Sequence, residues 1–225
     1  MVREEAALEG PFVRVRELSK RFGPDWALSR ANFALLRGQM ALLTGANGSG
    51  KTTLIQCLAT ALLPDFGEAS IAGHDLVTGR DEVRLCVAAL TQTPGAYGGL
   101  SARENLALAD AVLHLGRESA IESLLLRVGL AGRQDVPLET FSAGMKQRFA
   151  LARLALLQRD LVLLDEPETH LDAAGLNLLG EMISEWKARG TAIVCATHAP
   201  ERFRSLGSFE VRLAGGHAHQ GMGGA

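Results

Sequence analysis

Short apolar runs alternate with longer helical patterns along most of the 225-residue chain. The segments 40–44, 161–166 and 191–198 are dominated by apolar residues and have the length of buried strands. Apolar residues at helical spacing occupy 51–63 and 173–190, and these segments stop at Pro64 and Gly190. Buried strands that alternate with helices are typical of a parallel sheet covered on both faces. The pattern therefore predicts an α/β core.

Other strand patterns occur in the first ninety residues. Segment 11–20 alternates apolar and polar residues, and 31–36 leads into a turn at Arg37-Gly38. Segment 67–76 is typical of a hairpin strand with a turn on each side, and 85–92 is a further short apolar strand. We therefore expect an antiparallel β subdomain beside the parallel core.

The middle of the chain is helical in pattern from residue 93 to 158. Ser101 and Glu104 match the S-x-x-E capping box, which predicts a helix over 104–116. A second helix is expected at 117–130 and a third after Phe141-Ser142. We predict a single domain over 1–225. Its core is 11–92 and 159–213, with an inserted helical subdomain at 93–158 and a disordered, glycine-rich tail at 214–225.

Composition narrows the functional classes. Apolar residues make up 47% of the chain and the formal net charge is −2, which is unlike a nucleic-acid-binding surface. The three cysteines, Cys57, Cys86 and Cys195, are far apart and form no CxxC pair, so neither a disulfide framework nor a zinc site is expected. The acidic N-terminus does not resemble a secretory signal. No run approaches the roughly 18 apolar residues of a membrane-spanning helix.

The segment "GANGSGKT" matches the phosphate-binding pattern G-x-x-x-x-G-K-[ST], between a predicted strand and a predicted helix. Its glycines let backbone N–H groups approach phosphate oxygens, and the helix N-terminus favours an anion. Lys51 would neutralise the β- and γ-phosphates, and the Thr52 hydroxyl is a suitable ligand for Mg²⁺. The alternative, a glycine turn with a solvated lysine, does not explain this context. The expected nucleotide-binding residues are Gly45, Asn47, Gly48, Ser49, Gly50, Lys51, Thr52 and Thr53.

Polar residues end three other apolar strands. Asp165 and Glu166 follow 161–164, Gln92 follows 85–90, and His198 follows 191–197. Carboxyl ends of parallel strands share one edge of a sheet, where α/β proteins bind ligands. We predict Glu166 as the general base for water and Thr52 and Asp165 as metal ligands, with Lys51, Gln92 and His198 at the same edge. The alternatives are two acids that cap a strand and a merely structural histidine.

Taken in order, these motifs resemble the ATP-binding subunit of the ABC transporter family over residues 11–213. "GANGSGKTT" resembles Walker A, "LVLLDE" Walker B, "THLD" (169–172) the D-loop and "FSAGMKQR" (141–148) the family signature. Gln92 resembles the Q-loop glutamine and His198 the switch histidine. The resemblance implies that both are catalytic and that Gln92 is a further metal ligand. Phe22 occupies the place of an aromatic that stacks on adenine, with Trp26 as a rival. The signature combined with Walker B is more specific than Walker A, which many NTPases share.

The resemblance implies a P-loop NTPase fold and an ATPase that uses ATP and Mg²⁺. It also implies a homodimer, or a pair with a related subunit, in which two copies enclose two ATP molecules head to tail. Ser142 and Gly144 of one copy would then contact the γ-phosphate held by the other. Gln92 and the segment after it would pass the motion to integral-membrane permease subunits at the cytoplasmic side of the cell membrane. No nucleic-acid partner is implied.

Departures from the common signature suggest a subtype. Ala143 and Met145 stand where glycine and glutamine are usual. This version resembles exporters, either the haem-exporter type of cytochrome c biogenesis or small ABC-2 exporters. We also expect no room after Leu213 for a C-terminal regulatory domain of the importer type. An alternative is a soluble ABC-type ATPase of DNA maintenance or repair, but the segment between the Walker motifs has no sustained heptads. An unrelated P-loop kinase or GTPase would not carry the signature.

Overall fold

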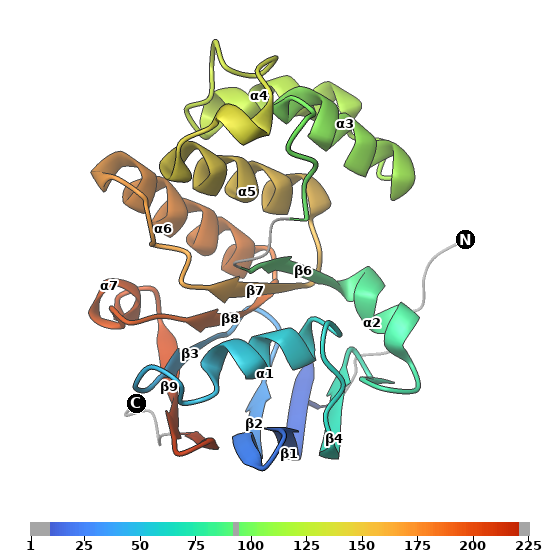
Figure 1. Ribbon diagram of the computed structural model, residues 1–225, viewed down its shortest axis with the longest axis vertical. Coiled ribbons are helices and arrows are strands. Elements are labelled where there is room, and N and C mark those ends of the chain that lie inside the picture. Colours follow the sequence, from blue (N-terminus) through green and yellow to red (C-terminus); the bar gives the residue numbers. More distant parts are fainter. Residues whose placement is uncertain (1–9, 92–94, 221–225) are drawn as a thin grey trace.

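A mixed sheet with helices on both faces forms the frame of the molecule (Figure 1). The computed structural model describes residues 10–91 and 95–220. The strand order is β5-β4-β1-β2-β10-β9-β3-β8-β7-β6. The predicted α/β class, with a parallel core and an antiparallel part, is confirmed.

The parallel part contains the strands that carry the phosphate-binding loop and the acidic residues. Its strands are β9 (Ser208–Ala214), β3 (Met40–Thr44), β8 (Ala192–Ala196), β7 (Leu161–Asp165) and β6 (Val87–Leu90). Every neighbouring pair in this order is parallel. The carboxyl ends of β3, β7 and β8 therefore lie at one edge of the sheet, as the sequence predicts.

The antiparallel part begins the chain. It consists of β1 (Val13–Phe22), β2 (Asp25–Leu35), β4 (Phe66–Ile71) and β5 (His74–Asp75). Register shifts interrupt the β1–β2 pairing, and Glu17 and Arg30 have positive φ angles of 50° and 48° there. Strand β10 (His217–Gln220) connects the two parts, because it pairs antiparallel with β9 and parallel with β2.

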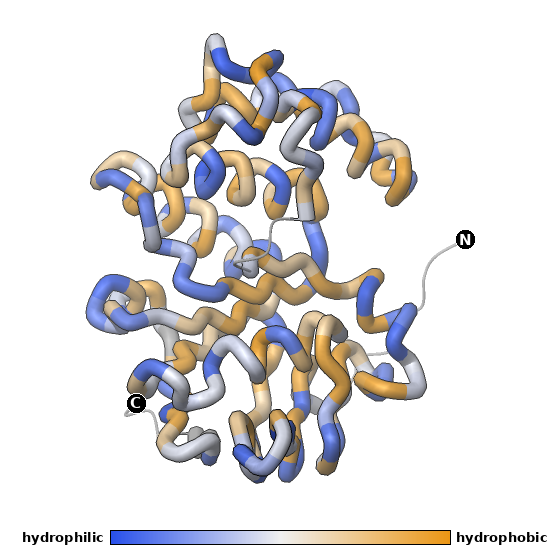
Figure 2. Tube along the Cα trace, in the orientation of Figure 1, coloured by the Kyte–Doolittle hydropathy of each residue, from blue (hydrophilic) through white to orange (hydrophobic). Residues whose placement is uncertain are grey.

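The central strands separate two hydrophobic cores because their side chains alternate between the faces of the sheet. In β3, Met40 and Leu42 face the core beneath the helical part of the chain, whereas Ala41 and Leu43 face the core around α1. Strands β7 and β8 alternate in the same way. Figure 2 shows these strands as a largely hydrophobic band between more polar outer segments. Burial on both faces explains why these strands are continuous apolar runs in the sequence.

Helices cover both faces of the sheet (Figure 1). They are α1 (Lys51–Leu58), α2 (Arg80–Cys86), α3 (Ala102–Val112), α4 (Ile121–Arg127), α5 (Ala143–Leu157), α6 (Ala173–Ala188) and α7 (Glu201–Arg204). Two 3-10 turns lie within the helical part: η1 (Glu118–Ala120) between α3 and α4, and η2 (Leu138–Thr140) between α4 and α5. The capping box predicted for Ser101 and Glu104 is present at the start of α3. One core joins α3–α5 to the sheet, so the helical part is packed firmly against it.

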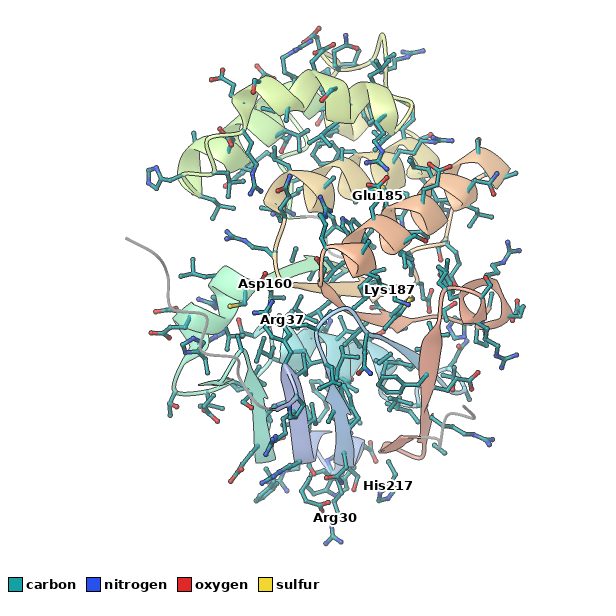
Figure 3. All side chains as sticks on the ribbon, turned by 180° about the vertical axis from the view of Figure 1, so that it is seen from behind. Arg30, Arg37, Asp160, Glu185, Lys187 and His217 are labelled. Atoms are coloured by element: carbon teal, nitrogen blue, oxygen red, sulfur yellow. The ribbon has the colours of Figure 1, made fainter. Side chains whose placement is uncertain are left out.

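Long-range polar contacts hold the layers together (Figure 3). Glu185 of α6 accepts two hydrogen bonds from Arg127 at the end of α4, at 3.0 and 2.6 Å. Arg37 and Asp160 form an ion pair at 3.5 Å between the turns that precede β3 and β7. Lys187 of α6 donates to the carbonyl oxygen of Gly207 at 2.9 Å and thereby anchors the turn before β9.

Some details differ from the sequence-based expectations. The tail is not disordered from residue 214, because His217–Gln220 form β10 against β9. The helix expected over 51–63 ends at Leu58, and the start of the strand expected at 85–92 belongs to α2, with β6 limited to Val87–Leu90. Within residues 10–91 and 95–220, no helix is both long and apolar enough to cross a bilayer.

Candidate functional site

A cleft of about 560 Å³ opens where the carboxyl edge of the parallel strands meets the antiparallel part. It brings together the phosphate-binding loop, the start of α1 and the residues after β7 and β8. The lining residues are Phe22, Ala27, Asn47, Gly48, Ser49, Gly50, Lys51, Thr52, Thr53, Glu166 and His198. The predicted phosphate-binding loop, Phe22, Glu166 and His198 come from four separate segments of the sequence and meet in this cleft.

Glycines of the loop are required for two different reasons. At Gly50, with φ 101°, an added Cβ would lie 2.2 Å from the Ala27 carbonyl oxygen of β2. At Gly45, with φ 148°, it would lie 2.3 Å from the Leu213 carbonyl oxygen of β9. Gly48 also has a positive φ, 74°, but an added Cβ there would meet open space. Gly45 and Gly50 therefore let the loop pack tightly against neighbouring strands, and Gly48 supports its left-handed turn.

Helix α1 begins with donors directed at the cleft. Its N-cap residue is Gly50, which supplies no capping side chain, so the first N–H groups of the helix are left for an external acceptor. The Lys51 side chain lies over the loop and donates to the carbonyl oxygens of Gly45 and Ala46, at 2.8 and 3.1 Å. Backbone N–H groups, a helix N-terminus and an ammonium group together form an anion site suited to phosphates.

Lys51 is buried, with 6% of its surface exposed. Burial lowers the pKa of its ammonium group, and the carboxylates of Glu166 and Asp165 oppose that effect by raising it. The ammonium is therefore poorly hydrated at this position. A poorly hydrated cation gains more from a phosphate than a solvated one, because less water must be displaced.

Two oxygen groups suited to a hard metal ion lie side by side, on Thr52 at the start of α1 and on Asp165 at the end of β7. The Thr52 hydroxyl donates to Asp165 Oδ1 at 3.2 Å. Asp165 Oδ2 and Ser49 Oγ are both buried and have no hydrogen-bond partner within the described structure. The unpaired Asp165 Oδ2, next to the Thr52 contact, fits an Mg²⁺ ion with its phosphate ligands, because Mg²⁺ is usually held by one or two protein oxygens plus substrate. In the described part of the chain, no cluster of three or more His, Cys, Asp or Glu suits an all-protein metal site.

Asp165 is a buried carboxylate, and burial raises its pKa. The hydrogen bond from Thr52 and the positive charge of Lys51 lower the pKa but do not cancel the effect of burial, and the charge of Glu166 raises it further. A carboxylate in this setting is stabilised by a cation or a proton beside it. The electrostatics therefore agree with a metal ligand at this position.

Glu166 and His198 meet across the cleft. His198 Nε2 lies 2.7 Å from Glu166 Oε1. Glu166 has a positive φ of 51°, and its N–H donates to the Ala196 carbonyl oxygen of β8 at 2.9 Å. A glutamate held in a left-handed conformation is strained, and such strain persists where the surrounding structure maintains it, commonly at functional sites. This geometry places a potential general base beside the phosphate-binding loop.

The aromatic wall of the cleft contains Phe22 and not Trp26. Phe22 is 52% exposed and lines the cleft. Trp26 instead packs against Phe66, with ring centroids 5.9 Å apart and planes at 47°, and lines a separate hollow. Ala27 also lines the nucleotide cleft, which sequence reasoning missed because a small residue within a strand carries no local signal.

The predicted signature residues lie outside the cleft. Ser142 is the N-cap of α5, and its hydroxyl accepts a hydrogen bond from the Met145 N–H at 3.3 Å. Gly144 lies close to the D-loop segment, since an added Cβ would be 2.9 Å from the His170 carbonyl oxygen. Neither residue lines the nucleotide cleft of its own chain. Gln92 lies outside the described residues.

The assembled motifs agree with the comparisons with known proteins. The sequence model of the family described as "ABC transporter" matches residues 28–169, which run from β2 through the phosphate-binding loop and signature segment to the loop after β7. This chain belongs to the ABC transporter family. As a member of that family it is an ATP-binding and ATP-hydrolysing domain, which confirms the predictions of family and enzyme class.

Its curated relatives include ATP-binding proteins of several transport systems. The cytochrome c biogenesis ATP-binding export protein CcmA of Salmonella typhi is 37% identical over 169 residues, covering 75% of this chain and 80% of CcmA. The bacitracin transport protein BcrA of Bacillus licheniformis is 31% identical over 195 residues, covering 86% and 64%. The daunorubicin resistance protein DrrA3 of Streptomyces coeruleorubidus is 33% identical over 197 residues, covering 86% and 62%. The chain thus spans slightly less than two thirds of BcrA and DrrA3.

Solved structures confirm the P-loop NTPase fold predicted from the sequence. An ATP-binding subunit of an ABC transporter superposes with a TM-score of 0.87 at 31% identity, covering 93% of this chain and 89% of that one. The ATP-binding cassette MJ0796, solved as a dimer in a post-hydrolysis state bound to ADP and Pi, gives a TM-score of 0.82 at 23% identity, covering 95% and 100%. This second likeness concerns the fold alone.

Proposed function

We propose that this chain is the energy subunit of a transporter, which hydrolyses ATP between two paired copies and drives a membrane permease. One observation carries the proposal: the phosphate-binding loop with Thr52 and the Glu166–His198 pair line one cleft, and Thr52 contacts the buried Asp165 carboxylate. Phosphate binding alone would need only the loop. The carboxylates and the histidine are the additional groups that hydrolysis requires.

Each group in the cleft has a role that its position supports. The N–H groups of the loop and the start of α1, together with Lys51, bind the phosphates of ATP, and Phe22 stacks on the adenine. Glu166 accepts a proton from the attacking water, and His198, which contacts it at 2.7 Å, orients that water and the γ-phosphate. Thr52 and Asp165 would hold Mg²⁺, which neutralises charge on the phosphates when it is bound.

Pairing of two copies would bring the signature residues of one copy to the cleft of the other. Ser142 and Gly144 begin α5 and lie outside the cleft of their own chain. The exposed Ser142 hydroxyl and the N-terminus of α5 form an anion site that fits the γ-phosphate held by a second copy. ATP would therefore join the two copies, and its hydrolysis would release them.

The relatives support a role in export at the cytoplasmic face of a membrane. Curated relatives act in bacitracin transport, cytochrome c biogenesis export and daunorubicin resistance. The signature with Ala143 and Met145, which resembles that of exporters, points to the same role. Permease subunits would supply the membrane span and choose the substrate, and Gln92 with the segment after it would pass motion to them.

Nucleotide binding and hydrolysis by the purified chain test this proposal. The wild type is expected to bind ATP and to hydrolyse it in the presence of Mg²⁺, and excess GTP should compete poorly. Lys51→Ala should lose most of its ATP affinity because the phosphates lose their buried cation. Arg133→Ala removes an exposed cation of the helical part and is the matched control. Unchanged ATP binding by Lys51→Ala, or a strong preference for GTP, would refute the assignment.

A further inference from the structure

Two loops that follow neighbouring strands are joined by two side-chain contacts. The loop after β7 carries Glu166 and Glu168, and the loop after β8 carries Thr197 and His198. Glu166 contacts His198 within the cleft, at 2.7 Å. The second contact is a hydrogen bond from the Thr197 hydroxyl to Glu168 Oε1, which lies outside the nucleotide cleft. No role follows for Glu168 from phosphate binding or metal binding.

Thr197 controls the backbone on both sides of His198. It is buried, with 1% of its surface exposed, and its hydroxyl accepts a hydrogen bond from the Ala199 N–H at 2.9 Å. A hydroxyl has a single proton, so its remaining donor capacity is directed to Glu168. The residues before and after His198 are therefore held by one hydroxyl, and Glu168 determines the orientation of that hydroxyl.

A glutamate at position 168 carries a free-energy cost that a purely structural contact would not require. Its second carboxylate oxygen, Oε2, is buried and has no hydrogen-bond partner within the described structure. An unpaired buried polar atom costs free energy, and a neutral acceptor would serve the Thr197 hydroxyl with less desolvation. A carboxylate gives a stronger, charge-assisted hydrogen bond than a neutral acceptor. The arrangement favours a firm hold on the loop over maximal stability.

We propose that Glu168 is a positioning residue that, through Thr197, holds His198 against Glu166 for ATP hydrolysis. The inference rests on the proposed function, because it concerns the same reaction. Glu168 itself does not line the nucleotide cleft. Its loss would leave the phosphate-binding loop unchanged and let the 197–199 loop move, so that His198 spends less time in contact with Glu166.

Such a role predicts a defined kinetic signature. Small displacements of catalytic groups slow chemistry by up to about 100-fold without changing substrate binding. Glu168→Ala should therefore lower kcat about 10–100-fold while the KM for ATP and the ATP affinity stay within about twofold. Because hydrolysis is slowed and binding is kept, the ATP-bound dimer should also accumulate on gel filtration. A merely structural defect would lower ATP binding and kcat together.

Conservative variants separate positioning from folding. Thr197→Ser keeps the hydroxyl and should retain most of the wild-type kcat, whereas Glu168→Gln keeps an acceptor without the charge and should lose less kcat than Glu168→Ala. Thr197→Val removes the hydroxyl with little change of shape and should reproduce the Glu168→Ala defect. The double variant Glu168→Ala/Thr197→Val should be no slower than either single variant, because both break one chain of contacts. Glu201→Ala removes an exposed carboxylate near the start of α7 and is the matched control.

The outcomes distinguish this inference from the proposed function. Absence of ATP hydrolysis by the wild type overturns both. Hydrolysis by the wild type together with an unchanged kcat in Glu168→Ala or Thr197→Val overturns the inference alone. Loss of ATP binding in Glu168→Ala, or additive defects in the double variant, likewise contradicts a positioning role through Thr197.

Discussion

The nucleotide cleft and the start of α5 are both anion sites in form, but they differ in how they are built. The cleft holds a buried lysine and glycines that permit tight packing on two strands, and its Thr52 contacts the buried Asp165 carboxylate. The start of α5 is exposed, and Ser142 caps the helix with its own hydroxyl. The cleft can therefore bind phosphates within one chain, whereas the start of α5 is accessible to a second molecule.

This difference separates binding from turnover. Changes in the cleft should act on a single chain and alter ATP affinity or the chemical step directly. Changes at the start of α5 should leave ATP binding by one chain intact and act only when two chains meet. Four substitutions test this division.

The largest effect is expected from Glu166→Gln. The amide cannot accept a proton from water, so turnover should fall at least about 100-fold, the range for loss of a general base. ATP affinity should be retained, since the phosphate-binding loop is unchanged. Steady-state hydrolysis and equilibrium binding measure the two quantities, and turnover near the wild-type rate would remove Glu166 from the proposed role.

Gly50→Ala should be the next most harmful change. Its Cβ would lie 2.2 Å from the Ala27 carbonyl oxygen at a φ of 101°, so the loop must move and ATP binding should be lost. Gly73→Ala is the matched control, because Gly73 lies outside the cleft, its φ is 82°, its Cβ meets open space and the cost is only the left-handed conformation, about 1–2 kcal/mol. Thermal unfolding and ATP titration compare them. Equal effects would show that packing on β2 does not shape the loop.

Ser142→Ala should separate stability from turnover. Loss of the N-cap should cost about 1 kcal/mol of stability, and turnover should fall about tenfold because a contact to the γ-phosphate across the dimer is lost. Ser101→Ala removes the N-cap of α3, whose side chain likewise accepts a hydrogen bond from an N–H of its own helix. This variant should lose similar stability while turnover stays unchanged. If both variants hydrolyse ATP equally well, Ser142 has no role beyond capping.

The smallest effect is expected at the aromatic wall. Phe22→Ala should weaken ATP binding about 2–10-fold, as expected for the loss of one stacking contact. Trp26→Ala should leave ATP affinity unchanged, because Trp26 packs on Phe66 outside the cleft. Fluorescence titration with an ATP analogue measures both, and the reverse order would assign adenine stacking to Trp26.

The sequence predicts the parallel core well because buried strands are continuous apolar runs with polar ends. The strand expected at 40–44 is β3 as found, and the residues after β3, β7 and β8 share one edge. Strand β10 was not predictable, since its glycine-flanked sequence has no strand pattern. Its pairing depends on β2, which is distant in the sequence, and on β9, which lies across a turn. The Glu168–Thr197 contact was hidden for a similar reason: each residue is unremarkable alone, and only the adjacency of β7 and β8 brings them together.

The size of the Glu166→Gln variant with and without MgATP tests the central claim most directly, because slow hydrolysis should preserve the ATP-bound state. Gel filtration with light scattering should show a monomer without nucleotide and a dimer with MgATP. Adding Ser142→Arg should abolish the dimer while ATP binding to the monomer persists, because the arginine blocks the surface that meets the second copy. A Glu166→Gln chain that stays monomeric with MgATP, or a dimer that tolerates Ser142→Arg, would contradict a site shared between two chains.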